Sequence, residues 1–133
     1  MPITISSKRE HNLIIITHKG VISDNEFLEF YSRFFQSDTL GSSKKLLIDL
    51  READSNQRST GTLHQFAGFV RKQLKDPKVK PKVAVVAPKS LSYGLARMYQ
   101  SYADSVPWEF VVFRAVDAAL AWLNVPEDII ECN

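Results

Sequence analysis

Two adjacent hydroxyl side chains, Ser59 and Thr60, stand between a polar stretch and a segment with helical periodicity. A hydroxyl at a helix start can cap free backbone N–H groups, and a phosphate placed there meets the same groups and the positive end of the helix dipole. Helix capping is the simpler interpretation, and we favour it. The alternative is that Ser59 or Thr60 is a phosphorylation site.

Three arginines are candidates for binding an anion. Arg51 and Arg58 follow a predicted strand, and Arg97 lies on a predicted helix. They would meet near the C-terminal edge of a parallel sheet, where α/β folds generally bind ligands, and a small anionic molecule or a phosphorylated peptide would suit such a rim. We favour a simpler arrangement, in which Arg51 pairs with Glu52 or Asp54 and Arg97 is solvated, because surface arginines are common.

The polar stretch also holds a candidate catalytic group. Asp54 could act as a general acid or base in an enzyme that uses the segment 51–60. No nucleophile and base can be placed within reach of each other from the sequence, so this is the least favoured function. Asp49, at the end of the preceding strand, is expected to make a structural hydrogen bond.

Aromatic side chains recur at helical spacing on two predicted helices. The first helix carries Phe27, Phe30, Tyr31, Phe34 and Phe35, and the third, capped by Ser90, has the buried stripe Leu91, Leu95, Met98, Tyr99 and Tyr102 with Tyr93 beside it. Packing in the core is the favoured role of these side chains. The alternatives are an apolar pocket between the helices and a homodimer face. Candidate binding or regulatory residues on the third helix are Ser90, Tyr93 and Arg97.

The remaining reactive side chains form no recognisable motif. His11, His18 and His64 lack the spacing of metal ligands, and the single cysteine, Cys132, excludes an intrachain disulfide. The five glycines form no phosphate-binding loop and no nucleophile elbow. We therefore expect neither a metal nor a cofactor.

The composition fits one globular domain with a hydrophobic core. The chain has 133 residues, of which 44% are hydrophobic and 24% charged, and its 17 basic and 15 acidic side chains give a net charge of +2. This balance does not favour nucleic acid, and the basic stretch 71–82 carries no aromatic residue to stack on bases. The chain shows no signal peptide and no apolar run of the roughly 20 residues that span a bilayer, so we expect a cytoplasmic protein that is not transmembrane.

Strand patterns alternate with helix patterns along the chain. Strands are predicted at 3–6, 13–16, 46–50, 83–87 and 108–113, and helices begin after the capping box of Ser23 and Glu26, at Ser59 or Thr60, at Ser90 and at Val116. The segment 51–59 is predicted to be a loop. Alternating strands and helices favour an α/β fold with a mostly parallel sheet.

Several phrases carry a family resemblance. The segments LLIDL, KVAVVAP, YGLARMYQSYAD and VVFRAVDAALAWL resemble the SpoIIAA-like family, which is related to STAS domains. The resemblance covers about Ile3 to Leu123 and implies a five-stranded sheet in consecutive order, with the first strand antiparallel and four helices in a βα superhelix. We expect a single domain with a core at about 3–124 and a C-terminal tail at 125–133.

The resemblance also implies functions. Its relatives include anti-sigma factor antagonists, whose regulatory serine follows an aspartate at a helix start; the matching place here is Ser59 to Gly61, preceded by Arg58. We therefore predict a non-enzymatic regulatory or interaction module that binds a protein partner. Comparison of this family with the CRAL-TRIO fold implies the alternative, a carrier of a small molecule or lipid.

Overall fold

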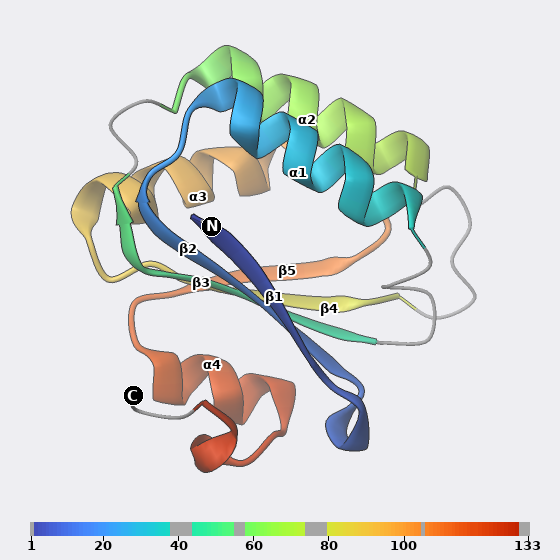
Figure 1. Ribbon diagram of the computed structural model, residues 1–133, viewed down its shortest axis with the longest axis vertical. Coiled ribbons are helices and arrows are strands. Elements are labelled where there is room, and N and C mark those ends of the chain that lie inside the picture. The colour runs from blue at the N-terminus through green and yellow to red at the C-terminus, as the bar shows by residue number, and fades with distance from the viewer. Residues whose placement is uncertain (1, 38–43, 55–57, 74–79, 105, 131–133) are drawn as a thin grey trace.

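Five strands form one sheet in which the spatial order follows the chain (Figure 1). In this computed structural model the strands are β1 Ile3–Lys8, β2 Leu13–Val21, β3 Lys45–Asp54, β4 Lys82–Val86 and β5 Glu109–Phe113. Strand β1 runs antiparallel to β2, and every other pair is parallel, as predicted. The structure describes residues 2–37, 44–54, 58–73, 80–104 and 106–130.

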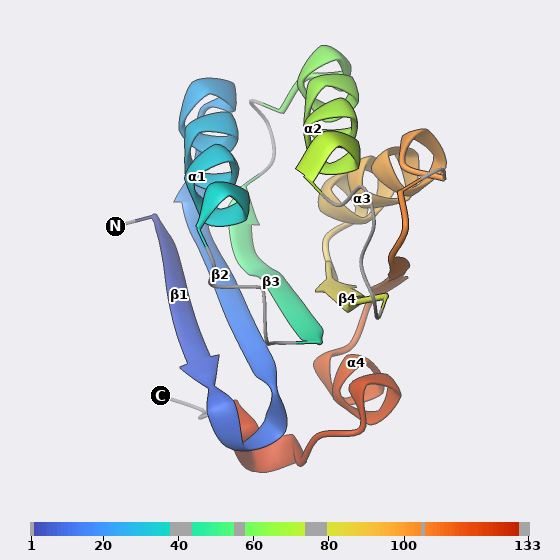
Figure 2. The ribbon, with the colours of Figure 1, turned by 90° about the vertical axis from the view of Figure 1, so that its right-hand side faces the viewer.

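Helices cover both faces of this sheet. Helices α1 Asp24–Gln36, α2 Thr60–Gln73 and α3 Ser90–Tyr102 lie on one face, and α4 Val116–Leu123 with the 3-10 turn η3 Glu127–Ile129 lies on the other (Figures 1 and 2). The α/β architecture with four helices is therefore confirmed. None of the helices in the described residues is both long and apolar enough to cross a bilayer.

Two hydrophobic cores explain the continuous apolar run at the start of β2. Ile14 and Ile16 pack into the larger core beneath α1, α2 and α3, whereas Leu13 and Ile15 pack into the smaller core beside α4. Successive side chains of a strand point to opposite faces, so a strand covered on both faces needs apolar residues at every position. The tight connection from β1 uses the turn η1 Arg9–His11 and Asn12, whose φ of 54° lies in the left-handed region that asparagine tolerates.

The helix starts confirm two predicted caps and correct a third. Ser23 and Glu26 form the capping box of α1, and the backbone N–H of Thr62 donates to Ser59 Oγ at 3.1 Å at the start of α2. Ser90, in contrast, is the first residue of α3 and caps nothing; the N-cap position belongs to Lys89, which makes no side-chain cap. The prediction for Ser90 was wrong, because a capping hydroxyl stands one position before the first helical residue, and Ser90 is itself that first residue.

The polar segment after Leu50 is a strand in part. The prediction of a loop from 51 to 59 was wrong for residues 51–54, which extend β3. Residues 52–54 pair with Lys19, Gly20 and Val21 beyond an irregularity in β2. Backbone hydrogen bonds to β2 hold this extension, so its side chains need not be apolar. Residues 55–57 lie outside the described residues, as do Cys132 and the middle of the basic stretch, 74–79.

The buried face of α3 agrees only in part with the predicted stripe. Tyr99 is buried as predicted, whereas Leu91 and Met98, also predicted to be buried, are 49% and 37% exposed. Ser92 is buried although it lies outside the predicted stripe, because a search for hydrophobic periodicity gives no weight to a serine. After α4, Val125 is buried and Ile129 and Ile130 pack against the smaller core.

Candidate functional site

A pocket of about 80 Å³ lies between the sheet and helices α1, α2 and α3 and opens to solvent. Its wall is mostly apolar and includes Phe27 of α1, Phe66 of α2, Leu95 of α3 and Phe110 of β5. Polar side chains also line it, namely His18, Tyr31, Asp54, Arg58, Ser92 and Tyr99. The pocket therefore combines an apolar wall with a small number of hydrogen-bonding groups.

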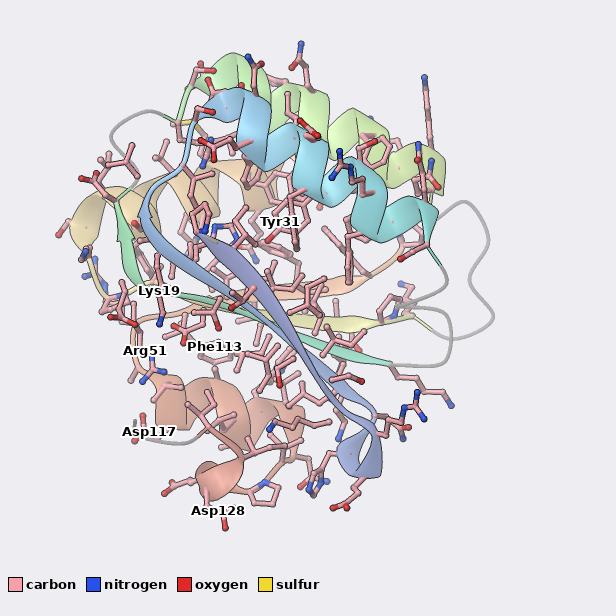
Figure 3. All side chains as sticks on the ribbon, viewed as in Figure 1. Lys19, Tyr31, Arg51, Phe113, Asp117 and Asp128 are labelled. Carbon is pink, nitrogen blue, oxygen red and sulfur yellow. The ribbon has the colours of Figure 1, made fainter. Side chains whose placement is uncertain are left out.

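His18 and Tyr31 form the polar contact between the sheet and α1. His18 shares a face of β2 with Ile14 and Ile16, and its Nε2 lies 2.7 Å from the hydroxyl oxygen of Tyr31. Figure 3 shows Tyr31 beneath α1, on the side of the sheet that faces the three helices. Burial, helped by the positive charge of Arg58, lowers the pKa of His18 to about 3, so the imidazole is neutral at neutral pH.

Tyr99 is a second buried tyrosine among the residues that line the pocket. The side chain is 3% exposed, and its ring packs against Phe66 and Phe110 with centroid separations of 4.9 and 5.1 Å. Its hydroxyl has no hydrogen-bond partner within the part of the chain that the structure describes. Burial and the nearby Tyr31 raise the pKa of Tyr99, so the phenol keeps its proton.

Arg58 immediately precedes Ser59, the N-cap of α2, and its side chain forms part of the pocket wall. Its guanidinium lies 4.1 Å from the ring centre of Phe27, and it donates to Asp24 Oδ1 at 2.9 Å and to the carbonyl oxygen of Ile22 at 3.2 Å. Burial works against ionisation of Asp24, but hydrogen bonds from Ser59 and Arg58 outweigh it and hold the pKa of Asp24 below its usual range. Arg58 thus ties the start of α2 to the start of α1.

Comparison with known proteins identifies the fold. No family model and no curated protein matches this sequence. A solved structure of an uncharacterised DUF3478 protein from Shewanella loihica PV-4, described as having a SpoIIAA-like fold, matches with a TM-score of 0.58. The alignment covers 91% of each chain at 20% sequence identity. The chain has a SpoIIAA-like fold.

Within this SpoIIAA-like fold, the predicted arginine cluster does not form. Arg51 lies on the α4 side of the sheet (Figure 3), where its Nε donates to Asp49 Oδ1 at 3.0 Å and its Nη2 to Oδ2 at 2.9 Å. Arg58 is on the opposite side, in the pocket wall. The alternative in which the two arginines meet is therefore wrong, because Arg51 shares a face of β3 with Asp49, whereas Arg58 follows β3 and contacts the start of α1. The expected structural hydrogen bond of Asp49 is present.

Two of the predicted site residues, Asp54 and Arg58, line the pocket. The predicted residues of α3, which are Ser90, Tyr93 and Arg97, lie beside it. Tyr93 accepts a hydrogen bond from Arg97 at 3.3 Å, and the guanidinium of Arg114 lies 4.1 Å from the centre of its ring. Ser90, Tyr93 and Arg97 are absent from the pocket wall as the described residues define it. Thr60 is exposed at the first position of α2.

The sequence did not indicate His18 or Ser92 as pocket residues. A signal for His18 was present, because positions 14, 16 and 18 alternate along a predicted strand and therefore share a face. Tyr99 was assigned to the core with a pocket between the helices as the alternative, and it is both buried and part of the pocket wall. For Ser92 no signal exists, since a serine on a helix is usually exposed.

The pocket wall holds residue types that can act in catalysis. They are a serine that could be a nucleophile, a histidine that could be a base and an aspartate that could be an acid, namely Ser92, His18 and Asp54. A general base works best with a pKa near the working pH. The pKa of His18 is about 3, and its Nε2 is already hydrogen-bonded to Tyr31. This arrangement favours binding over proton transfer.

Proposed function

We propose that this protein binds a small, mostly apolar ligand in the pocket between its sheet and helices α1, α2 and α3. The observation that carries the proposal is the pocket itself, an apolar cavity into which a few buried polar groups project. Small-molecule sites commonly have this composition, with apolar walls for affinity and few polar groups for orientation.

A regulatory function at the start of α2 remains a prediction with weaker support. Ser59 Oγ accepts from the backbone of Thr62, and the carboxylate of Asp24 accepts from Ser59 N at 3.3 Å. A phosphate on Ser59 would lie beside this carboxylate and be repelled by it. Both residues are exposed, but the hydroxyl of Ser59 is hydrogen-bonded in the helix cap, so Thr60 is the better acceptor of a phosphate. Binding of a protein partner or of a second copy also stays a prediction.

Native mass spectrometry of protein purified from its own host tests the proposal. We expect a mass above that of the chain, which denaturation returns to the value calculated from the sequence. Ala96→Leu adds side-chain volume to the pocket wall on α3, and we expect this variant to carry less ligand. The control is Ala118→Leu, the same change on the exposed side of α4.

Equal loading of the Ala96→Leu and Ala118→Leu variants would place any bound molecule outside the pocket. Wild-type protein that is free of ligand, and that also binds no apolar molecule added to it, would contradict the proposed function. Recovery of an intact protein partner in the same spectra would instead support the interaction module.

A further inference from the structure

Helix α3 holds two large apolar side chains in water. Leu91 and Met98 are among the exposed large hydrophobic residues of the described chain. Seven residues separate them, which is close to two helical turns, so they lie on the same side of the helix, about 10 Å apart along its axis. Neither belongs to the wall of the ligand pocket. The two side chains therefore protrude from the helix into solvent.

Positive charge surrounds these two side chains. Helices α2 and α3, which lie next to each other on one face of the sheet (Figure 2), contain no aspartate or glutamate along their whole lengths. Arg97 is exposed beside Met98, and Lys72 is exposed near the end of α2. Arg114 is exposed beside α3, where its guanidinium lies over the ring of Tyr93. The other two helices, in contrast, both carry acidic residues.

The three cations have no carboxylate partner among the described residues, whose ion pairs involve other basic side chains. Arg97 donates to the hydroxyl of Tyr93, and Arg114 donates to the carbonyl oxygen of Pro88, which are neutral groups. Asp104, two residues after α3, is the described carboxylate closest to this helix in the chain. We call this positively charged and partly apolar surface the α3 face. It consists of Lys72, Leu91, Arg97, Met98 and Arg114.

The composition of the α3 face limits what can cover it. A second copy of the chain would bring cations against cations, because a two-fold interface joins the same surface of both subunits. A nucleic acid would bind the cations through its phosphates but leave Leu91 and Met98 in water. An acidic helical peptide matches the charge, but such helices dock into hydrophobic grooves, whereas these apolar side chains protrude. A bilayer with anionic lipids accepts protruding apolar side chains and attracts the basic ones.

We propose that the α3 face docks on the surface of a membrane that contains anionic phospholipids. Leu91 and Met98 enter the boundary between the headgroups and the acyl chains. Arg97, Lys72 and Arg114 lie at the level of the lipid phosphates, which their long side chains reach while the protein stays outside the bilayer. The docking goes beyond the proposed function, because it needs no ligand in the pocket.

Docking would also bring the ligand pocket to the membrane. Leu95 comes four residues after Leu91 and three before Met98, so it lies on the same side of α3, and it lines the pocket. Leu95 thus joins the pocket wall to the α3 face. A membrane is a reservoir of apolar molecules, so a protein docked in this way would meet the ligands that an apolar pocket accepts.

Flotation with lipid vesicles tests the proposal. We would mix the purified full chain with vesicles of phosphatidylcholine alone and with vesicles of phosphatidylcholine and phosphatidylglycerol in equal amounts. We expect binding to the anionic vesicles to be about tenfold tighter or more. Sodium chloride at about 1 M should weaken this binding to the level of the neutral vesicles, because it shortens the screening length to about 3 Å.

A double variant tests the apolar contact. Leu91→Ser with Met98→Ser should bind the anionic vesicles about tenfold more weakly, because it removes the side chains that enter the bilayer. The matched control is Ile5→Ser with Val21→Ser, which changes two exposed hydrophobic residues of β1 and β2. We expect the control to bind as the wild type does. Thermal denaturation verifies that both variants fold.

A second double variant tests the charges. Lys72→Gln with Arg97→Gln should weaken binding to the anionic vesicles about tenfold and leave binding to the neutral vesicles unchanged. Arg9→Gln with Lys19→Gln is the control, because it removes the same charge from the β1–β2 hairpin. This control should keep most of the affinity of the wild type.

Several outcomes would overturn the proposal. Failure to bind anionic vesicles, equal binding to both kinds of vesicle, or equal losses in the variants and their controls would show that the α3 face is not a membrane contact. A wild-type dimer that Leu91→Ser with Met98→Ser converts to a monomer would assign the face to a second copy. Capture of a host protein that the same variant abolishes would assign it to a protein partner. None of these results affects the pocket, which native mass spectrometry tests without vesicles.

Discussion

The imidazole Nε2 of His18 lies 2.7 Å from the hydroxyl oxygen of Tyr31, and this hydrogen bond joins β2 to α1 inside the larger core. Tyr31 is 1% exposed, so neither partner can exchange this bond for one to bulk water. The bond distinguishes Tyr31 from Tyr99, a second buried tyrosine whose hydroxyl has no partner in the described residues. The two tyrosines therefore form a matched pair for substitution.

Removal of the two hydroxyls should have opposite consequences for stability. Tyr31→Phe leaves His18 without its partner in the core, and we expect it to lower the free energy of unfolding by about 1–2 kcal/mol. Tyr99→Phe removes a hydroxyl that is not hydrogen-bonded in the ligand-free protein, and we expect no loss or a gain of up to about 1 kcal/mol. Urea denaturation of ligand-free protein measures both, and a clear loss in Tyr99→Phe would reveal a partner for its hydroxyl.

The stability of the protein should fall in mild acid because of His18. Its pKa is about 3 in the folded protein and 6.5 in the unfolded chain, so between these values the unfolded state binds a proton that the folded state lacks. The contribution is complete above pH 6.5 and is lost as the pH falls toward about 3. From about pH 7 to about pH 5 we expect a loss of roughly 2 kcal/mol.

Urea denaturation at both pH values tests this loss. His18→Gln should flatten the dependence on pH, because the variant has no imidazole to protonate at this position. His64→Gln is the matched control at an exposed position of α2, and it should keep the wild-type dependence. An unchanged pH dependence in His18→Gln would show that other groups cause the loss.

The fold was predictable because its segments follow the two basic periodicities. Strands covered on both faces are continuously apolar, and α1 and α2 bury regular apolar stripes. The pocket was harder to predict, since it depends on which face of α3 turns inward. Ser92 and Ala96 contribute to its wall, and small side chains carry little signal of burial in a sequence.

The carboxylate partners of the two arginines were also not predictable from the acidic residues next to them in the chain. Arg58 meets Asp24 across a separation of 34 residues. Arg51 meets Asp49, two residues away, because alternate residues of a strand share a face. Predicted pairings with adjacent acids ignored this alternation, whereas the partner of Arg58 depends on how α1 and α2 pack together.

The two serines predicted to cap helices should respond differently to substitution. Ser59→Ala removes the acceptor of the Thr62 backbone N–H, and we expect a loss of about 1 kcal/mol in the free energy of unfolding. Ser90→Ala should change stability by less than about 0.5 kcal/mol, because Ser90 is already within α3 and caps nothing. Thermal denaturation of the two variants measures the difference, and equal losses would contradict these cap assignments.

The ion pair of Arg58 and Asp24 should stabilise the packing of α1 against α2 more than a surface pair does. The side chain of Arg58 is 9% exposed and that of Asp24 is 29% exposed, so water screens the interaction only in part. A double-mutant cycle with Arg58→Met and Asp24→Ala should give a coupling energy of about 1–2 kcal/mol, between the values typical of surface and buried pairs. The pair Glu29 and Arg33, exposed along α1, supplies the control and should give about 0.3–0.5 kcal/mol.

Salt provides a second measurement of the same contact. Added sodium chloride at about 1 M shortens the screening length to about 3 Å, which should abolish the coupling of Glu29 with Arg33 and leave most of that between Arg58 and Asp24. A coupling for Arg58 and Asp24 as small and as sensitive to salt as the control would mean that water reaches this contact. Arg58 would then be held mainly by the ring of Phe27 and the carbonyl of Ile22, and the Asp24→Ala variant would keep the start of α2 in place.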